Sequence, residues 1–457
     1  MIHKYKNNGY NIVLDINSGC VHVVDDVMYE VLDTYIEDGR DKTLARLEGK
    51  YDPKDILESF DDIDALVDAN QLFTKDEYED AIARANAADI PVVVKALCLH
   101  VSHDCNLSCK YCFASEGEYH GKRQLMSYET GKAALDFLVK NSAGRRNLEV
   151  DFFGGEPLMN FEVVKKLVAY GRSLEDKYDK HFRFTLTTNG VLLNEDIMKF
   201  ANENMDNVVL SIDGRKSVHD RMRPFPKGDG SYDYVLPKFK KFSTLRGDKS
   251  YYVRGTYTHY NLDFSKDVLS LADEGFDQIS VEPVVAPPSD DYAIRNEDID
   301  KLLDEYDILA KEMLKRAKNG KGFNFFHFMI DLEGGPCVYK RLSGCGSGTE
   351  YLAVTPTGEL FPCHQFVGID EFKMGDVYSG VNNKSLQKMF RGCNVYSKPE
   401  CRECFARFYC SGGCAANAYH FAGDINGTYD IGCVLQKKRV ECAIMIKAAL
   451  ADEDGLL

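Results

Sequence analysis

The first 85 residues change from a β-type pattern of apolar positions to a helical one. Residues 11–26, NIVLDINSGCVHVVDD, hold two β-rich runs around a Ser-Gly turn, which predicts a hairpin. Two segments, 27–39 and 52–70, then place apolar residues at helical spacing. In the second segment one face carries Ile56, Phe60, Ile63 and Leu66. A hairpin followed by helices predicts a winged-helix-like module over residues 1–85, and a helical linker over 86–94 follows it.

From residue 95 the pattern alternates between short apolar runs and amphipathic segments. The apolar runs predict six strands, at 96–102, 147–154, 182–190, 207–214, 251–258 and 277–284. Helical segments such as 128–142 and 161–178 separate them, which predicts parallel strands with helical crossovers. Because no Gly-x-Gly-x-x-Gly turn occurs, a partial (β/α)6 barrel over 95–320 is favoured over a dinucleotide-binding sheet. Residues 297–319 predict a final amphipathic surface helix.

Polar residues and glycines gather where the predicted strands end. In chain order they are Cys105, Gly154, Gly155, Glu156, Thr188, Asn189, Ser211, Asp213, Arg254, Glu282 and Pro283. Active sites of barrels are built at the carboxyl ends of the strands. We therefore expect these six segments to converge on one site.

Composition narrows the class of protein. The chain has 457 residues and a net charge of −16, which argues against a nucleic-acid partner. No signal peptide and no apolar run long enough to span a membrane are evident, so we expect a cytoplasmic protein with no membrane partner. Fifteen cysteines in such a chain indicate metal binding or catalysis rather than disulfides. Three outliers, Cys20, Cys98 and Cys442, are interpreted as small buried or surface residues.

Three cysteines lie within residues 105–112, CNLSCKYC, at the spacing C-x3-C-x2-C. A structural zinc site normally has four ligands, and a ferredoxin-type run carries a fourth cysteine. Cys105, Cys109 and Cys112 can instead hold three irons of a [4Fe–4S] cubane. The fourth iron is then open to a reactant, which is typical of a catalytic site.

This spacing, with Tyr111 before the last cysteine, resembles the motif of radical S-adenosylmethionine enzymes. In that family the open iron chelates the amino and carboxylate groups of S-adenosylmethionine. One electron from the cluster cleaves the sulfonium to methionine and a 5′-deoxyadenosyl radical, which abstracts hydrogen from the substrate. The cofactor carries the chemistry and the protein positions it.

The resemblance also implies contacts to S-adenosylmethionine at the strand ends. GGEP, with Gly154, Gly155 and Glu156, resembles the stretch that grips the methionine end, where Glu156 can accept from the ammonium. TTNG and SIDG resemble the ribose and carboxylate contacts, which implies roles for Thr188, Asn189, Ser211 and Asp213. Arg254 can pair with the carboxylate in a planar bidentate manner.

A second group of cysteines falls in residues 321–457. The spacing C-x12-G-x4-C, then C-x2-C-x5-C-x3-C, then C, resembles the SPASM extension of these enzymes, which carries two auxiliary iron–sulfur clusters. By resemblance the inner cluster is held by Cys345, Cys363 and Cys414, and the outer one by Cys401, Cys404, Cys410 and Cys433. A zinc ribbon is the alternative, but only one C-x2-C pair occurs. The expected cofactors are three [4Fe–4S] clusters and S-adenosylmethionine.

The SPASM pattern supplies seven cysteines, whereas two fully ligated cubanes need eight. Cys337 and Cys393 lie outside the pattern, and either can fill the gap. We favour a vacancy on the inner cluster, because an open iron can bind a substrate thiolate and accept the electron released as a sulfur–carbon bond forms.

The order of the segments resembles maturases of ribosomally made peptides. Residues 1–85 resemble their recognition element, which adds a leader peptide to its sheet. The chain is most similar to the maturase family of the six-cysteines-in-forty-five-residues precursor, which joins cysteine sulfurs to backbone α-carbons as thioethers (sactipeptides). This implies a Cys-rich precursor peptide and a low-potential electron donor as partners.

Two other functions stay open. An anaerobic sulfatase-maturating enzyme, which forms formylglycine, is the runner-up, although that group generally lacks an N-terminal recognition module. A non-catalytic iron–sulfur protein is the other, and the three-cysteine loop with GGEP argues against it. The stretch HDRMRP, 219–224, is equally consistent with a substrate contact and with a salt bridge inside a loop.

Overall fold

The computed structural model describes residues 1–87, 91–119, 121–332 and 338–453. Its N-terminal part is a three-stranded antiparallel sheet, β1 (Ile2–Asn7), β2 (Tyr10–Asp15) and β3 (Val21–Val24), followed by the helices α1 (Asp26–Leu47) and α2 (Pro53–Asp68). The predicted hairpin is β2–β3. The sequence analysis missed β1, whose Lys4 and Lys6 give it a polar pattern because they pair with Asp33 and Asp26 at α1.

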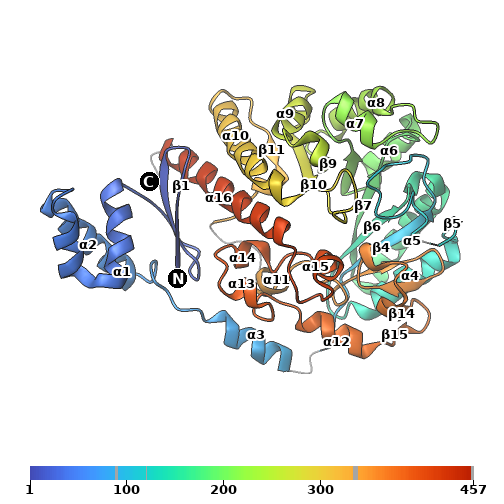
Figure 1. The fold of residues 1–457 in the computed structure, drawn as a ribbon. Coiled ribbons are helices and arrows are strands. Elements are labelled where there is room, and N and C mark those ends of the chain that lie inside the picture. The colour runs from blue at the N-terminus through green and yellow to red at the C-terminus, as the bar shows by residue number, and fades with distance from the viewer. Residues whose placement is uncertain (88–90, 120, 333–337, 454–457) are drawn as a thin grey trace.

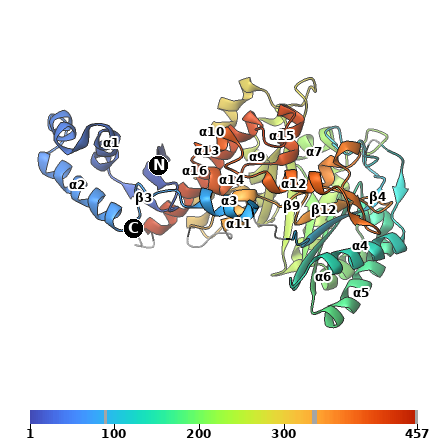
Figure 2. The same cartoon turned by 90° about the horizontal axis from the view of Figure 1, so that it is seen from below.

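The N-terminal sheet is covered on both faces (Figure 1). One face packs on α1 and α2, with Ile56, Phe60 and Ile63 buried and Leu66 half-buried, as their shared helical face predicts. The other face contributes Tyr5, Ile12 and Leu14 to the main core and lies against α16 (Asp430–Glu453). Only α1 and α2 project away from the body, which is plain from below as well (Figure 2).

The six predicted strands form a parallel sheet in the expected order. They are β4 (Ala96–His103), β6 (Asn147–Gly154), β7 (His181–Thr188), β8 (Asn207–Ser211), β9 (Tyr251–Tyr257) and β10 (Gln278–Pro283). The crossover helices are α4 (Tyr128–Asn141), α5 (Phe161–Tyr178), α6 (Glu195–Asn204), α7 (Lys216–Met222), α8 (Tyr232–Arg246), α9 (Ser265–Asp273) and α10 (Ile299–Lys318). The prediction of a partial barrel is confirmed, since the sheet is curved and open.

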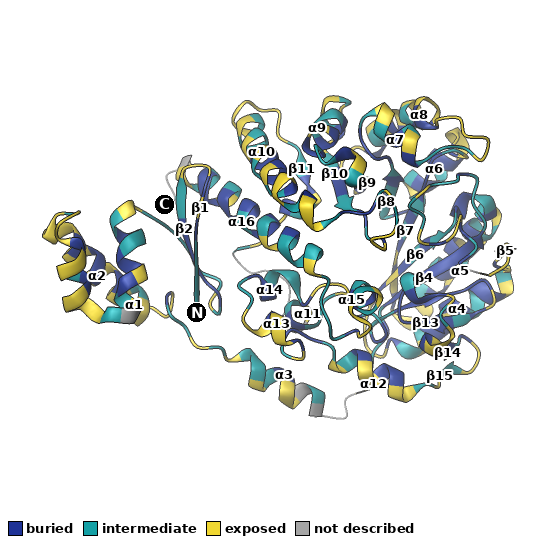
Figure 3. Cartoon of the chain, viewed as in Figure 1, coloured by how far each residue is buried: buried dark blue, intermediate teal, exposed yellow. Residues whose placement is uncertain are grey.

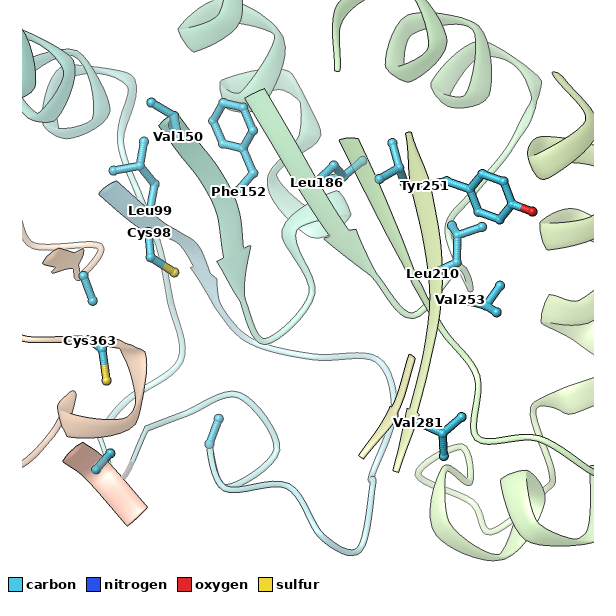
Figure 4. Packing of buried hydrophobic residues seen from close by; sticks show 14 of the residues in the cluster. Cys98, Leu99, Val150, Phe152, Leu186, Leu210, Tyr251, Val253, Val281 and Cys363 are labelled. Carbon is cyan, nitrogen blue, oxygen red and sulfur yellow. The ribbon is translucent and has the colours of Figure 1, made fainter. Parts of the chain in front are cut away.

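Apolar side chains from neighbouring strands fill the layer between this sheet and its helices. Leu99, Val150, Phe152 and Leu186 are buried there together (Figure 4). Figure 3 shows the strands largely buried (dark blue) and the outer faces of the helices exposed (yellow). This pattern is the physical origin of the apolar runs from which the strands were predicted.

The C-terminal segment extends the same sheet. Beside β4 lies β12 (Tyr351–Val354), which is parallel to it, and then β13 (Glu359–Phe361), β14 (Gly375–Asp376) and β15 (Gly380–Val381) follow in antiparallel order. The short β5 (Gln124–Leu125) and β11 (Asn324–Phe325) pair with β4 and β10. Residues 95–320 and 321–457 therefore share one sheet and one core.

One short helix precedes β12 and four others follow β15. They are α11 (Val338–Ser343), α12 (Lys384–Gly392), α13 (Pro399–Arg402), α14 (Arg407–Cys410) and α15 (Ala415–Ala422). The helix α3 (Tyr78–Ala87), expected to lead into the linker, packs on this region, where Ile82 is buried and Asp76 pairs with the buried Arg407 at 2.8 Å. None of the helices described here is long and apolar enough to cross a membrane.

Candidate functional site

The first three cysteines lie on the loop after β4. Backbone bonds fix this loop to the segment after α7, because Ser108 N–H donates to Pro224 O (3.0 Å) and Lys110 N–H to Met222 O (2.9 Å). Burial, the nearby Glu156 carboxylate and the neighbouring thiols raise the pKa of Cys105 to about 12, and burial raises that of Cys109 to about 11. A bound cation stabilises thiolates, so a loop with three thiols fits the implied iron–sulfur cluster by the chemistry of its side chains.

The two glycines of GGEP allow the end of β6 to touch the cysteine loop. A Cβ on Gly155 would lie 2.2 Å from the carbonyl oxygen of Asp104, and one on Gly154 would lie 2.2 Å from that of Ser102. Gly155 N–H donates to Ser102 O at 2.8 Å, and Glu156 N–H donates to Asp104 O at 2.9 Å. The glycines therefore serve a backbone contact with the loop that carries Cys105.

Replacing Gly155 with alanine is expected to displace the cysteine loop, because the clash is with backbone atoms. Overpacking of this kind costs about 1–3 kcal/mol. We expect the variant to bind less iron at the first cluster and to release 5′-deoxyadenosine about ten-fold more slowly, measured by iron analysis and chromatography. Gly144→Ala is the matched control, because nothing lies within 4 Å of its added Cβ. Normal iron content in Gly155→Ala would contradict this role.

Glu156 links three of the predicted strand ends. Its carboxylate is fully buried and accepts from Leu158 N (3.0 Å), Thr188 Oγ1 (2.8 Å) and Asn189 N (2.8 Å). Burial raises the pKa of Glu156 to about 7. Asn189 in turn donates to Asn106 Oδ1 at 2.7 Å and lies 3.6 Å from Cys105 Sγ. In this structure Glu156 is thus a positioning residue that holds Thr188 and Asn189 beside the cysteine loop.

Asp213 is the centre of a second buried network. Its carboxylate accepts from Tyr111 OH (2.6 Å), Arg223 Nε (3.0 Å) and Thr256 N (3.0 Å). The Arg223 guanidinium lies 5.4 Å from the centre of the Tyr111 ring. For HDRMRP the structure therefore contains the salt bridge, and this bridge anchors the aromatic residue of the cysteine motif. The role of Arg223 beside Cys109 was not predicted.

Arg254 faces the space between the sheet and the C-terminal segment. Ser211 and Arg254 are register neighbours on β8 and β9, and Arg254 pairs with Glu282 on β10 at 2.7 Å. The Arg254 side chain is 51% exposed. Burial, and then the charge of Arg254, lower the pKa of His364 to about 4, and burial also lowers that of His327. Sequence reasoning missed both histidines, although His364 directly follows a cysteine of the SPASM pattern.

The C-terminal cysteines lie in two groups. Burial, and then the thiols of Cys414 and Cys345, raise the pKa of Cys363. Burial, and then the thiols of Cys433, Cys401 and Cys404, raise the pKa of Cys410 to about 12. The thiols that act on Cys363 are thus those of the expected inner set, Cys345 and Cys414, and the thiols that act on Cys410 are those of the expected outer set, Cys401, Cys404 and Cys433.

One extra thiol lies beside the inner set. Cys345 and Cys393 line the same small cavity, whereas Cys337 lies outside the described residues. Within the described ranges no three His, Cys, Asp or Glu side chains are close enough to hold one metal ion.

The model of the radical SAM superfamily matches residues 99–241. These residues include the cysteine loop, the glycine contact, the Glu156 network and all of the Asp213 network except Thr256. Residues 99–241 are a radical SAM domain. The iron–sulfur cluster and S-adenosylmethionine are its implied cofactors.

The radical SAM domain and the part of the chain that follows it are similar to named proteins, both in sequence and in structure. The cysteine-type anaerobic sulfatase-maturating enzyme of Clostridium novyi (strain NT) is 25% identical over 335 residues, which cover 69% of this chain and 86% of that protein. The structure of anSMEcpe with bound AdoMet and Kp18Cys peptide aligns with a TM-score of 0.65 and 21% identity, over 79% of this chain and 99% of that one.

A third similarity spans nearly the whole chain. SuiB of Streptococcus suis bound to S-adenosylmethionine aligns with a TM-score of 0.53 and 15% identity, over 94% of this chain and 97% of that one. SuiB is also known bound to its precursor peptide SuiA. At these identities the solved structures establish the fold alone, which this chain shares with anSMEcpe and SuiB.

Proposed function

We propose that this protein is a peptide-modifying radical SAM enzyme that forms thioethers between cysteine sulfurs and α-carbons in a ribosomally made Cys-rich precursor. The observation that carries the proposal is the placement of three cysteine groups around one open sheet: a loop one ligand short of a cubane, an inner set and an outer set. The peptides bound by anSMEcpe and SuiB support a peptide substrate.

In the proposed site the bound cluster and S-adenosylmethionine supply the radical that removes hydrogen from the peptide. Gly154, Gly155 and Glu156 hold the cysteine loop in place, and Thr188, Asn189, Ser211 and Asp213 are the strand-end residues that would hold S-adenosylmethionine. Arg254 is the proposed partner of the cofactor carboxylate, because its guanidinium is half exposed and already oriented by Glu282.

The inner and outer sets are the proposed ligands of two auxiliary clusters, which gives three clusters in all. Forming a bond between a carbon radical and a thiolate releases one electron, and an auxiliary cluster is a suitable acceptor. The inner cluster keeps an open iron in this proposal unless Cys337 or Cys393 binds it, and Cys393 lines the same cavity as Cys345. If that iron is open, a core peptide that contains cysteine should change the auxiliary-cluster spectrum. The same peptide with serine in place of cysteine should leave the spectrum unchanged.

The N-terminal module is the proposed site of the leader peptide. Within the described residues β3 pairs with β2 alone, so its other edge is available for an added strand. Val21 and Val23 of this strand line a hollow with Ile330, Leu332 and the C-terminal part of α16. An extended apolar peptide can therefore add to the sheet and bury its side chains there.

Replacing Val21 and Val23 with aspartate is expected to weaken leader binding about ten-fold or more, measured by calorimetry with a synthetic leader. Uncoupled cleavage of S-adenosylmethionine should be unchanged. The matched control is Leu57→Asp with Val67→Asp, because these two side chains are exposed on α2. Point changes are preferable to deleting residues 1–85, since Tyr5, Ile12 and Leu14 belong to the main core. Equal leader affinity in both variants would argue against this site.

The proposed function is tested by mass spectrometry of a Cys-rich precursor after incubation with the reduced enzyme and S-adenosylmethionine. Loss of two hydrogen atoms per crosslink, with blocked cysteines, supports thioether formation. An aldehyde would instead favour formylglycine formation, the second candidate, which the similarity to sulfatase-maturating enzymes supports. An unmodified peptide despite release of 5′-deoxyadenosine would argue against both.

A further inference from the structure

Lys398 carries a deeply buried positive charge. The residue immediately precedes α13 and is 1% exposed. Its ammonium donates to the carbonyl oxygens of Gly412 (2.9 Å) and Gly427 (3.2 Å). No carboxylate in the described part of the chain forms an ion pair with it. Arg246, another deeply buried cation without a carboxylate, spreads its guanidinium over four carbonyl oxygens, so Lys398 is compensated less well.

The ammonium of Lys398 is bonded to the short loop that joins the two cysteine sets. Gly412 belongs to the run Ser411–Gly413, which has positive φ at every residue and joins Cys410 of the outer set to Cys414 of the inner set. Lys398 also lines the cavity that Cys345 faces.

We propose that Lys398 is the shared counter-ion of the two auxiliary clusters and raises their reduction potentials. The inference rests on the proposed function, because it requires both clusters. A buried ammonium without an anion is strongly unfavourable, so its position indicates where negative charge is bound. An oxidised cubane is a net monoanion with three thiolates and a net dianion with four, and reduction adds a further negative charge. A fixed cation therefore stabilises the reduced cluster more than the oxidised one.

The experiment compares Lys398→Gln, Lys398→Met and Lys398→Arg in the reconstituted full-length protein. Iron content and potentiometric titration followed by electron paramagnetic resonance are the readouts. We expect Lys398→Gln, which keeps hydrogen-bond donors but loses the charge, to shift both auxiliary potentials to more negative values. Lys398→Arg should remain near the wild-type values, and the first cluster should be unaffected. Lys388→Met, an exposed lysine on α12, is the matched control.

The outcomes separate a charge effect from a structural one. If Lys398→Met loses the auxiliary clusters, the potentials measured in Lys398→Gln still test the charge effect, because the glutamine amide can keep the hydrogen bond to Gly412. Unchanged potentials in Lys398→Gln at full iron content would overturn the inference and leave Lys398 as a support of the loop. A wild-type protein with only about four irons, one cubane, would instead overturn the three-cluster function itself.

Discussion

A protein in which Cys105, Cys109 and Cys112 are all replaced by alanine should release no 5′-deoxyadenosine from S-adenosylmethionine. These thiols are the only cysteines on the loop after β4, and that loop lies against GGEP and Asn189. Without them the radical SAM domain has no ligand for its cluster. Iron should fall from about twelve to about eight per chain, at four irons per cubane, while the auxiliary-cluster spectra persist.

The control for this variant is Cys20→Ala, which removes a half-buried thiol outside all three groups. It should keep its full iron content and its activity. Continued formation of 5′-deoxyadenosine by the triple variant would show that the loop does not hold the catalytic cluster. Loss of all iron would show instead that the three sites do not assemble independently.

Replacing Asp213 with alanine should destabilise the protein by about 3–5 kcal/mol, because it leaves the buried Arg223 without its carboxylate. Tyr111 and the backbone N–H of Thr256 lose the same acceptor. Since Tyr111 belongs to the cysteine motif, release of 5′-deoxyadenosine should fall as well. Denaturant unfolding gives the first quantity and product analysis the second.

Two comparisons make the Asp213 result specific. Glu195→Ala removes the carboxylate of an exposed pair with Lys241 and should cost less than about 1 kcal/mol. Combining Asp213→Asn with Arg223→Met should recover part of the stability, because no buried charge is then left unpaired. Equal losses for Asp213→Ala and Glu195→Ala would refute the proposed importance of the buried pair.

The sequence predicted best those elements whose burial is visible in their own local pattern of apolar residues. The six barrel strands were predicted to within a few residues because each is buried between the helices and the barrel interior. The strand β12 was missed because it has only four residues. The strand β1 was missed because it carries lysines, such as Lys4, that form ion pairs with aspartates of α1. Such elements are specified by contacts that a local pattern does not contain.

For the candidate site, too, the sequence predicted which residues gather but not which of them bond to one another. Convergence of the strand ends was foreseen from the barrel topology, and the two C-terminal cysteine sets from a family resemblance. The roles of individual residues differed from those predicted, because a role depends on which side chains are in contact in the folded protein. Glu156 bonds to Thr188 and Asn189, and Asp213 bonds to Arg223. Nothing in the spacing of these residues determines those pairings.

The position of β12 beside β4 has a consequence for biosynthesis. The two strands pair directly, yet about 250 residues separate Tyr351 from Ala96. While the ribosome is still making the chain, β4 is an edge strand with unpaired backbone groups, which invites aggregation. The edge closes only after β12 (Tyr351–Val354) has emerged, and a pairing this distant in sequence forms slowly. A prematurely terminated chain would therefore be a liability for the cell, even though its catalytic loop is complete.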